Sequence, residues 1–478
     1  MIQKNEQLFW RICPSCKGIG KKNRRPSEKT LRKYRQSLEI YSNKKTQVKP
    51  EKPKDNLKKC IACDGSGLIS TSTPTEINTN YPNVAIIGGG IGGFALAAAF
   101  SHRGIPFTIY EKDRSFNTRS QGYGLTLQQA SKALKGFGIT TLKEGVVSTK
   151  HIVHTTEGEI IGEWGMRKWL DNNTNPKKRK NTNIHIARQS LRLSLHNQVK
   201  KHDAIKWGHE FLSYQNDENE KLIINFKVGN DIITSSADLI VGADGIRSGV
   251  RQQLFIKDDY PLNYLDCFVM LGICPIKHLN DINSPLLDLK TVFQTANGNE
   301  RIYVMPYSTS AIMWQLSFTL PEEDAKILSR QQKSVLKQEA YGKTQWHYPI
   351  PEIIKATPLQ YISGYPVYDR DVLNIEDFKE GGSVTLIGDA AHPMSPFKGQ
   401  GANQALLDAL SLARRITKTC RINTDWKEKG IRTALLESFE RDMLHRTRIK
   451  VKASADAAKF LHSEVVLKKG NSPRGKAI

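Results

Sequence analysis

The chain has 478 residues, of which 38% are hydrophobic and 25% are charged, and its formal net charge is +24. A chain of this length can bury most of its apolar surface without disulfide staples, and its composition excludes collagen-like, coiled-coil and disulfide-rich miniprotein folds. Residues 1–70 hold 18 basic and 6 acidic residues, so half of the net charge lies in this short segment. The rest of the chain is only mildly basic.

The N-terminus lacks the apolar core of a secretory signal. The longest uncharged run, Val84–Phe100, contains five glycines and is short for a membrane span. We therefore expect a soluble, cytoplasmic protein with no transmembrane segment.

Residues 1–70 contain an internal repeat of the form C-x-x-C-x-G-x-G. The first copy begins with Cys13 and Cys16, and the second with Cys60 and Cys63. Four thiolates are the tetrahedral set that closes a structural zinc site, and the trailing glycines allow turns that direct backbone N–H groups at sulfur. We predict one structural zinc. Disulfides are the alternative, but they are rare in a reducing compartment.

A Lys/Arg-rich stretch, Lys21 to Lys59, separates the two copies. It predicts either a short basic helix around Glu28–Ile40 or no ordered structure. Residues 71–82 are rich in Ser, Thr, Pro and Asn and indicate a linker. We expect a four-cysteine zinc-binding module at residues 1–70 that folds when zinc binds and on which the rest of the chain does not depend.

The body of the chain begins with a strand–helix–strand unit. Its parts are a buried strand at Val84–Ile87, a small-residue helix at Ile91–Arg103 and a second strand at Phe107–Tyr110. Such a unit, about thirty residues long, is typical of a nucleotide-binding α/β domain.

A glycine motif joins the first strand to the helix, with glycines at Gly88, Gly90 and Gly93, and Glu111 ends the second strand. Glycine lets the backbone approach a pyrophosphate closely, and the helix N-terminus stabilises the phosphate charge. A carboxylate at Glu111 can accept hydrogen bonds from ribose hydroxyls. Together they predict dinucleotide binding; an acidic strand end in a plain α/β domain is the alternative.

Two longer motifs specify which dinucleotide is bound. They are Asp238-Leu-Ile-Val-Gly-Ala-Asp-Gly-Ile-Arg-Ser248 and Val384-Thr-Leu-Ile-Gly-Asp-Ala-Ala-His-Pro-Met-Ser-Pro-Phe-Lys-Gly-Gln-Gly-Ala-Asn403. Over residues 82–420 the chain resembles the FAD-dependent aromatic-ring hydroxylases, which are group A flavin monooxygenases with the p-hydroxybenzoate hydroxylase fold. The resemblance implies an α/β fold with a Rossmann-like FAD-binding domain and an inserted antiparallel β-sheet substrate domain.

The resemblance also implies domain boundaries. The FAD-binding domain takes residues 83–258 and, with the C-terminal helices, residues 371–465. The substrate-binding β domain takes residues 259–370. The segment at residues 466–478 is polar and contains Gly and Pro, so we expect it to be a mobile tail. Within the β domain, alternating segments offer apolar side chains that either line a substrate pocket or belong to ordinary sheet core: Tyr303, Tyr307, Met313 and Trp314.

The resemblance assigns the cofactor residues. Asp389 holds a ribityl hydroxyl, and Asp244 serves both FAD and the pyridine nucleotide, although a turn aspartate beside Gly245 is the alternative. Pro396 stiffens the loop past the flavin ring, and the helix that follows directs its N-terminal dipole at the ring. The predicted FAD-binding set is Gly88, Gly90, Gly93, Glu111, Arg119, Arg188, Asp244, Gly245, Gly388, Asp389, Pro396, Gly399, Gly401, Ala402 and Asn403.

No acid, base or nucleophile is assigned, because the flavin carries the oxygen-transfer chemistry. We expect His392 to be a loop residue beside the cofactor rather than a proton donor. Only one glycine fingerprint is present, so a second stable dinucleotide site is not expected. This agrees with the resemblance, which implies that NAD(P)H visits the flavin transiently. The single fingerprint also disfavours the two-domain disulfide reductases. The Trp-x-Trp-x-Ile-Pro segment of the flavin halogenases is absent from the sequence.

These motifs predict an FAD-dependent, NAD(P)H-consuming monooxygenase. It would insert one oxygen atom from dioxygen, through a flavin hydroperoxide, into an apolar, aromatic or polyunsaturated small molecule. The cysteine repeat resembles the zinc modules of DnaJ-type chaperones, although the His-Pro-Asp signature of these proteins is absent. The alternative function is therefore a flavoprotein that serves mainly as an interaction or chaperone-like adaptor.

The basic clusters bear on the choice of partner. They include Lys21–Arg25 and residues 177–180, and no aromatic side chains interleave with them to stack on bases. We therefore do not expect nucleic acid as a partner. A protein or an anionic surface that contacts the basic zinc module stays open.

Overall fold

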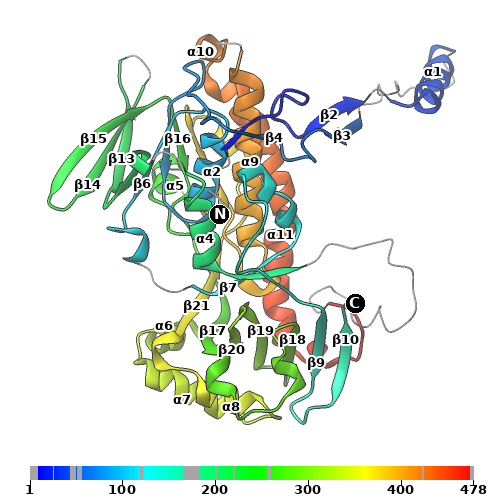
Figure 1. Ribbon diagram of the computed structural model, residues 1–478, viewed down its shortest axis with the longest axis vertical. Coiled ribbons are helices and arrows are strands. Elements are labelled where there is room, and N and C mark those ends of the chain that lie inside the picture. Colours follow the sequence, from blue (N-terminus) through cyan, green and yellow to red (C-terminus); the bar gives the residue numbers. More distant parts are fainter. Residues whose placement is uncertain are drawn as a thin grey trace, which may run out of the picture.

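The computed structural model of the protein describes residues 9–24, 26–43, 50, 56–118, 122–165, 183–199, 202–218, 221–255, 260–422 and 425–473. Two sheets occupy opposite ends of the body, and two long helices, α9 (Gly401–Cys420) and α11 (Glu437–Leu461), run between them (Figure 1). The four-cysteine module lies beside the end of the body that holds the parallel sheet (Figure 1).

The first sheet has five parallel strands in the order β12-β6-β5-β16-β22. Every residue of its central strand β5 is buried, as a parallel sheet covered on both faces requires. The helix α2 (Ile91–Ser101) packs between this sheet and α9, which explains why it is apolar on all sides. The strands are β5 (Val84–Ile87), β6 (Phe107–Glu111), β12 (Ile205–Trp207), β16 (Leu239–Gly242) and β22 (Val384–Leu386).

Two small sheets flank the first. They are β7-β11-β8, with β7 (Gly124–Leu127), β8 (Val146–Val147) and β11 (Ile184–Ala187), and the meander β13 (Glu210–Asn216), β14 (Leu222–Val228) and β15 (Asp231–Ala237). Three short helices complete this part: α4 (Arg188–His196), α5 (Gly249–Leu254) and α10 (Trp426–Lys429).

The second large sheet has seven strands in the order β10-β9-β18-β19-β20-β17-β21, and only the β9–β18 pair is parallel. Helices α6 (Glu322–Ser329), α7 (Lys333–Lys343) and α8 (Ile350–Ala356) cover one face with an apolar core. The strands are β9 (Lys150–His154), β10 (Ile160–Trp164), β17 (Asn263–Pro275), β18 (Thr291–Ala296), β19 (Arg301–Ser308), β20 (Ala311–Thr319) and β21 (Ile362–Asp369).

This architecture confirms the predicted α/β fold with an inserted, largely antiparallel sheet. The sheet also recruits β9 and β10, which precede the boundary predicted at residue 259, because β9 pairs with the edge of β18. Part of the predicted C-terminal tail is attached to the same sheet. Gly470 donates to the Ile161 carbonyl oxygen at 2.9 Å, and Asn471 Oδ1 accepts from the Glu163 amide at 3.0 Å.

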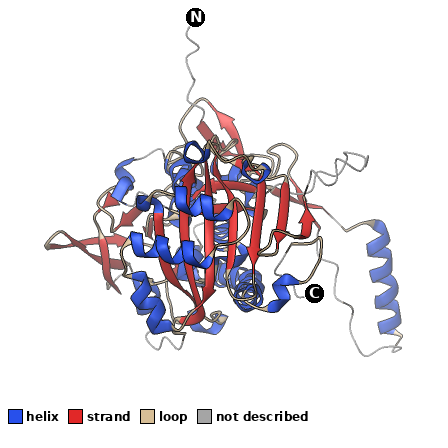
Figure 2. Cartoon of the chain, turned by 90° about the horizontal axis from the view of Figure 1, so that it is seen from below, coloured by secondary structure: helices blue, strands red, loops and turns tan. Residues whose placement is uncertain are grey.

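The four-cysteine module consists of two strand pairs and one helix. β1 (Phe9–Ile12) pairs with β4 (Leu68–Thr71), and β2 (Lys21–Arg24) pairs with β3 (Asn56–Lys59). The predicted basic helix is present as α1 (Glu28–Ser42). It has no buried residue and stands away from the body (Figures 1 and 2).

The sequence suggests that the linker separates this module from the body, but the structure shows direct contacts between the two. Thr75 within the linker donates to the Trp10 carbonyl oxygen at 2.6 Å, and Arg414 on α9 donates to the carbonyl oxygens of Gly65 and Ser66. A surface ion pair between Lys135 and Asp64 adds a third contact. The linker composition could not reveal these contacts because their partners lie far away in the sequence.

Candidate active site

The glycine loop after β5 has the conformation that the motif predicts. Gly88 has a φ of +104°, and a β-carbon on Gly93 would lie 1.9 Å from the Gly88 oxygen, so both positions need glycine for the fold itself. Gly90, which caps α2, differs: a β-carbon there would meet nothing closer than Arg188 Nη2 at 4.0 Å. The backbone at Gly90 therefore borders open space, as a phosphate cradle requires.

Glu111 holds this loop from the end of β6. Its side chain is buried, with Oε2 accepting from the Gly89 amide at 2.6 Å and Oε1 accepting from the Asp113 amide at 2.9 Å. Each carboxylate oxygen still has a second lone pair. The ribose contact stays a prediction, and the structure adds a second role in which Glu111 fixes the loop conformation.

Arg192 is a site residue that the sequence motifs did not indicate. It is 3% exposed, and its Nε donates to the Gly89 oxygen at 2.7 Å. Its guanidinium lies 4.6 Å from the Phe116 ring centroid and 5.3 Å from that of Phe94. The sequence could have indicated Arg192 through its position four residues after Arg188, because this spacing places both arginines on one face of the helix.

Arg188 begins α4, as predicted. Its guanidinium lies 5.9 Å from the ring centroid of Tyr123, and its charge acts on Asp389 across the site. Arg119 lies outside the described residues, so its predicted contact with the cofactor stays a prediction.

Asp389 lies beyond β22 on a turn at Gly388, whose φ is +61°. It is an exposed residue, and it lines the large cavity described below. Enclosure by the surrounding protein raises the pKa of Asp389, while the charges of His392 and Arg188 oppose this rise. A β-carbon on Gly401 would lie 3.4 Å from Asp389 Oδ1, so the first turn of α9 lies beside the carboxylate.

His392 is fully buried and does not line the cavity. Its Nε2 lies 2.7 Å from Asp408 Oδ2, which also accepts from the Gly388 amide at 2.9 Å. Burial would raise the pKa of Asp408, but His392 and Arg446 outweigh it and lower the pKa to about 2. The ionised Asp408 thus fixes His392 and the Gly388 turn together, which favours a positioning role for His392.

The loop that opens α9 lines the cavity through Pro396, Gly399, Gly401 and Ala402. Asn403 does not share this role. Its Oδ1 accepts from the amides of Gln128 and Ala130, and its Nδ2 donates to the oxygens of Thr126 and Gly399. Asn403 therefore joins β7 to the loop, and its predicted contact with FAD stays a prediction.

Asp244 follows β16 on the predicted turn. Its Oδ2 accepts from the Val250 amide at 3.3 Å, whereas its buried Oδ1 has no hydrogen-bond partner. Burial raises the pKa of Asp244. Gly245 beside it has a φ of +84° and borders open space.

A cavity of about 1450 Å³ separates the α9 loop from the open face of the seven-stranded sheet. Of the four predicted lining residues, Tyr303 and Met313 face this cavity. Trp314 faces away because side chains alternate along a strand, and its Nε1 donates to Thr357 Oγ1 at 2.9 Å within the opposite core. Tyr307 donates instead to the Gly122 oxygen at 3.2 Å.

The sheet side of the cavity also carries a buried cation that sequence reasoning missed. Arg301, which is 5% exposed, donates to Gln294 Oε1 from Nε at 2.8 Å and from Nη2 at 2.6 Å. Burial lowers the pKa of Arg301 to about 10. No Asp or Glu among the described residues forms an ion pair with it. Gln315 lies nearby on β20.

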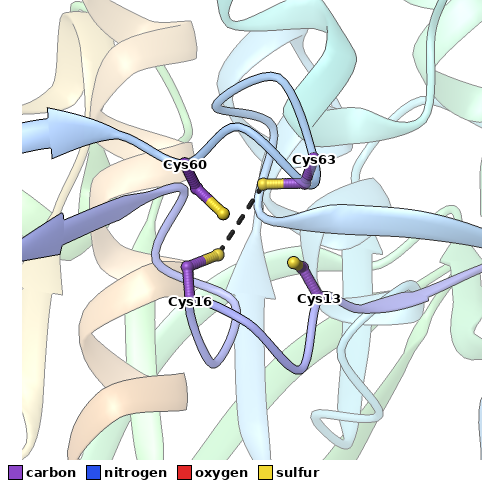
Figure 3. Close-up of side chains that lie close together, drawn as sticks. All are labelled: Cys13, Cys16, Cys60 and Cys63. Carbon is purple, nitrogen blue, oxygen red and sulfur yellow. Dashed lines mark hydrogen bonds between the residues drawn. The ribbon is translucent and has the colours of Figure 1, made fainter.

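The four predicted zinc ligands come together in the four-cysteine module (Figure 3). Their sulfur atoms all lie within 4.8 Å of one another, and none of them is in a disulfide. The Cys16–Cys63 sulfur separation of 3.7 Å agrees with the edge of about 3.8 Å expected for a tetrahedron with Zn–S bonds of about 2.3 Å.

The second glycine of each motif copy supports this arrangement. Gly20 donates to Cys16 Sγ at 3.1 Å, and Gly67 donates to Cys63 Sγ at 3.3 Å. Backbone N–H donors of this kind stabilise thiolates, as the repeat had predicted. The donor set therefore fits a metal ion that prefers sulfur.

Comparison with known proteins defines the class. The family model described as an FAD binding domain matches residues 81–427, and the chain therefore belongs to this family. The chain is 31% identical over 336 residues to the aurachin C monooxygenase/isomerase of Stigmatella aurantiaca, covering 69% of this chain and 79% of that protein. It is 28% identical to the chloroplastic zeaxanthin epoxidase of Oryza sativa subsp. japonica, covering 74% of this chain and 50% of that protein.

Solved structures support the fold. Klebsiella pneumoniae HpxO, complexed with FAD and uric acid, aligns with a TM-score of 0.64 at 19% identity, over 80% of this chain and 89% of that chain. The protein is thus an FAD-dependent monooxygenase. The open cradle at Gly90 and the unpartnered Oδ1 of Asp244 fit this cofactor. Among the described residues, no helix is both long and apolar enough to cross a bilayer.

Proposed function

We propose that this monooxygenase consumes NAD(P)H and dioxygen to add one oxygen atom to a small molecule held in the cavity between the α9 loop and the seven-stranded sheet. The cavity carries this proposal, because it places Asp389 and the first turn of α9 opposite a sheet face of mixed apolar and polar side chains. Its volume exceeds the range of about 300–1,000 Å³ typical of sites for one drug-sized ligand, so a flavin ring and a substrate fit together.

FAD, when bound, supplies the redox and oxygen-transfer chemistry. The chain supplies position and electrostatics. Gly90 and the N-terminus of α2 would hold the pyrophosphate, Glu111 the ribose, and Asp389 a hydroxyl of the ribityl chain. The N-terminus of α9 at Gly401 favours negative charge near the ring.

The sheet side selects the substrate. Met305, Met313 and Tyr303 give the cavity an apolar wall, and Arg301 with Gln294 gives it a polar end. We propose an apolar, aromatic or polyunsaturated molecule with one oxygen that accepts a hydrogen bond from this end. The names of the relatives include an epoxidase, so the product screen covers epoxidation as well as hydroxylation.

Substrate-stimulated NADPH and NADH oxidation tests this function. The yellow holoenzyme is screened against phenols, quinolones and polyenes, and products are examined by mass spectrometry for the gain of one oxygen atom. We expect stimulation with at least one class and an oxygenated product. Stimulation of oxidation without any oxygenated product, in every class, would contradict the proposal.

We further propose that Cys13, Cys16, Cys60 and Cys63 bind one structural zinc ion. The module has almost no apolar core apart from these cysteines, and a structural zinc contributes on the order of 10 kcal/mol to folding. Cys60→Ser should lower the zinc content measured by mass spectrometry, whereas the matched control Cys274→Ser, at a buried cysteine of β17, should leave it at one per chain. Equal zinc content in both variants would refute this site.

A further inference from the structure

Two arginines of the FAD-binding body lie beside the four-cysteine module: Arg103 is fully buried, and Arg414 is half-buried. Arg103, just after α2, is 1% exposed, and its Nη1 donates to the oxygens of Ala99 and Gly136 at 3.0 and 3.2 Å. Its Nε and Nη2 are buried and have no hydrogen-bond partner. A buried guanidinium is costly unless a negative charge compensates it.

Arg414 lies on α9 and reaches into the module. Its Nη2 donates to the oxygens of Gly65 and Ser66 at 2.8 and 3.0 Å, just beyond Cys63, while its buried Nε has no partner. A β-carbon on Gly20, in the other copy of the motif, would lie 2.6 Å from the same Nη2. The guanidinium therefore lies against the turns that follow both cysteine pairs.

No carboxylate compensates either arginine among the described residues. The nearby Asp64 pairs instead with Lys59 and Lys135 at the surface. Burial lowers the pKa of Arg103 to about 9 and repulsion from Arg414 adds to this, whereas the charges of Tyr81, Cys16 and Cys63 oppose it. The same two cysteines oppose the effect of burial on the pKa of Arg414.

Four thiolates around one Zn²⁺ carry a formal charge of about −2, and two guanidinium groups carry about +2. We propose that Arg103 and Arg414 are the counter-charges of the zinc–tetrathiolate centre, so that the four-cysteine module and the FAD-binding body form one electrostatic unit. This inference rests on the zinc site proposed above. The two arginines position and stabilise the centre without being metal ligands.

Two helices connect this electrostatic unit with the flavin site. Arg414 belongs to α9, whose first turn lines the cavity, and Arg103 follows α2, whose N-terminus faces the glycine loop. Loss of zinc would leave two cations without a counter-charge, Arg103 just after α2 and Arg414 in the C-terminal half of α9. The body should therefore depend on the module, contrary to what the linker suggests.

The first test measures zinc release from the full-length holoprotein to a colorimetric chelator. Arg414→Met should weaken zinc binding by about 10–100-fold, as the loss of an outer-shell partner typically does. Lys135→Met is the matched control, because it removes the same charge from an exposed ion pair at the same interface. Equal zinc release from the two variants would overturn the inference.

The second test separates charge from packing by thermal unfolding with zinc and after its removal under reducing conditions. Zinc removal should lower the Tm of the wild-type chain more than that of Arg414→Met, because methionine leaves no buried charge unpaired. The same loss of Tm in both proteins would overturn the inference. If Arg414→Met does not fold, Arg103→Met goes through both tests. A wild-type chain without zinc would instead refute the zinc site itself.

Discussion

The two walls of the cavity are built in different ways. The proposed flavin wall is built largely on the backbone of the loop Pro396–Ala402 at the start of α9, with Asp389 beside it. The proposed substrate wall consists of side chains at alternate positions of the neighbouring strands β19 and β20, such as Arg301 and Met313. A backbone wall needs particular residues at fixed spacing, whereas a side-chain wall can change without altering the fold.

The largest effects on folding and on FAD content should come from substitutions in the glycine loop. One glycine of this loop is needed for the fold, and another is needed for the cofactor. Gly93→Val should prevent folding, because its β-carbon would overlap the Gly88 oxygen. Gly90→Val should fold but carry little FAD, because its side chain would fill open space at the cradle. Circular dichroism and flavin absorbance distinguish the two; full FAD in Gly90→Val would show that the cradle lies elsewhere.

Asp389→Ala should also give largely apo-protein with an intact fold. The substitution removes the carboxylate that faces the cavity beside α9. Asp371→Ala, at an exposed residue just beyond β21, is the control and should keep its flavin. Retained flavin in both variants would remove Asp389 from the flavin wall.

Glu111→Gln should weaken FAD binding by about 1.5–3 kcal/mol, the usual value of a hydrogen bond to a charged group. The amide oxygen keeps one acceptor, but the side chain can no longer accept from both Gly89 and Asp113. Titration of apo-protein with FAD measures the change. Unaltered affinity would mean that Glu111 supports only the strand end.

A buried histidine should make the protein sensitive to acid. Burial lowers the pKa of His185 on β11 to about 3, well below the value of about 6.5 in an unfolded chain. The unfolded state therefore binds a proton first, so this stability is present above pH 6.5 and falls as the pH drops, by about 2 kcal/mol at pH 5.

Chemical denaturation between pH 5 and 7 measures this loss. His185→Asn should reduce the pH dependence, because asparagine keeps a polar atom toward Thr126 but cannot take up the proton. A smaller dependence should remain, because burial also lowers the pKa of His151, His154 and His462. His278→Asn, at an exposed histidine, should not flatten it. The same slope in all three proteins would argue against His185 as its source.

The smallest effect should come from Arg301→Met. It should raise KM for the substrate by about tenfold, the value of one lost hydrogen bond of roughly 1.4 kcal/mol, and leave the FAD content unchanged. Steady-state kinetics with the substrate found in the oxidation screen measure it. A change in FAD content without a change in KM would place Arg301 with the flavin rather than with the substrate.

The features that could be predicted from the sequence are those that depend on local backbone geometry. Gly88 and Gly93 are needed within a single strand-to-helix turn, and the cysteine pairs with their trailing glycines form two short turns, so their spacing could be recognised without a structure. The FAD-binding fold and the assembly of the four cysteines were predictable for this reason.

Side-chain contacts and orientations that depend on residues far away in the sequence became visible only in the folded chain. Arg192 reaches Gly89 from another helix, Trp314 turns away from the cavity because of the register of β20, and Arg414 reaches Gly65 across 349 residues. A side chain's spacing in the sequence does not reveal which of two faces it takes or which remote carbonyl it meets. The proposed dependence of the body on the four-cysteine module is of this kind, because Arg103 and Arg414 come to lie beside the module only when the chain folds.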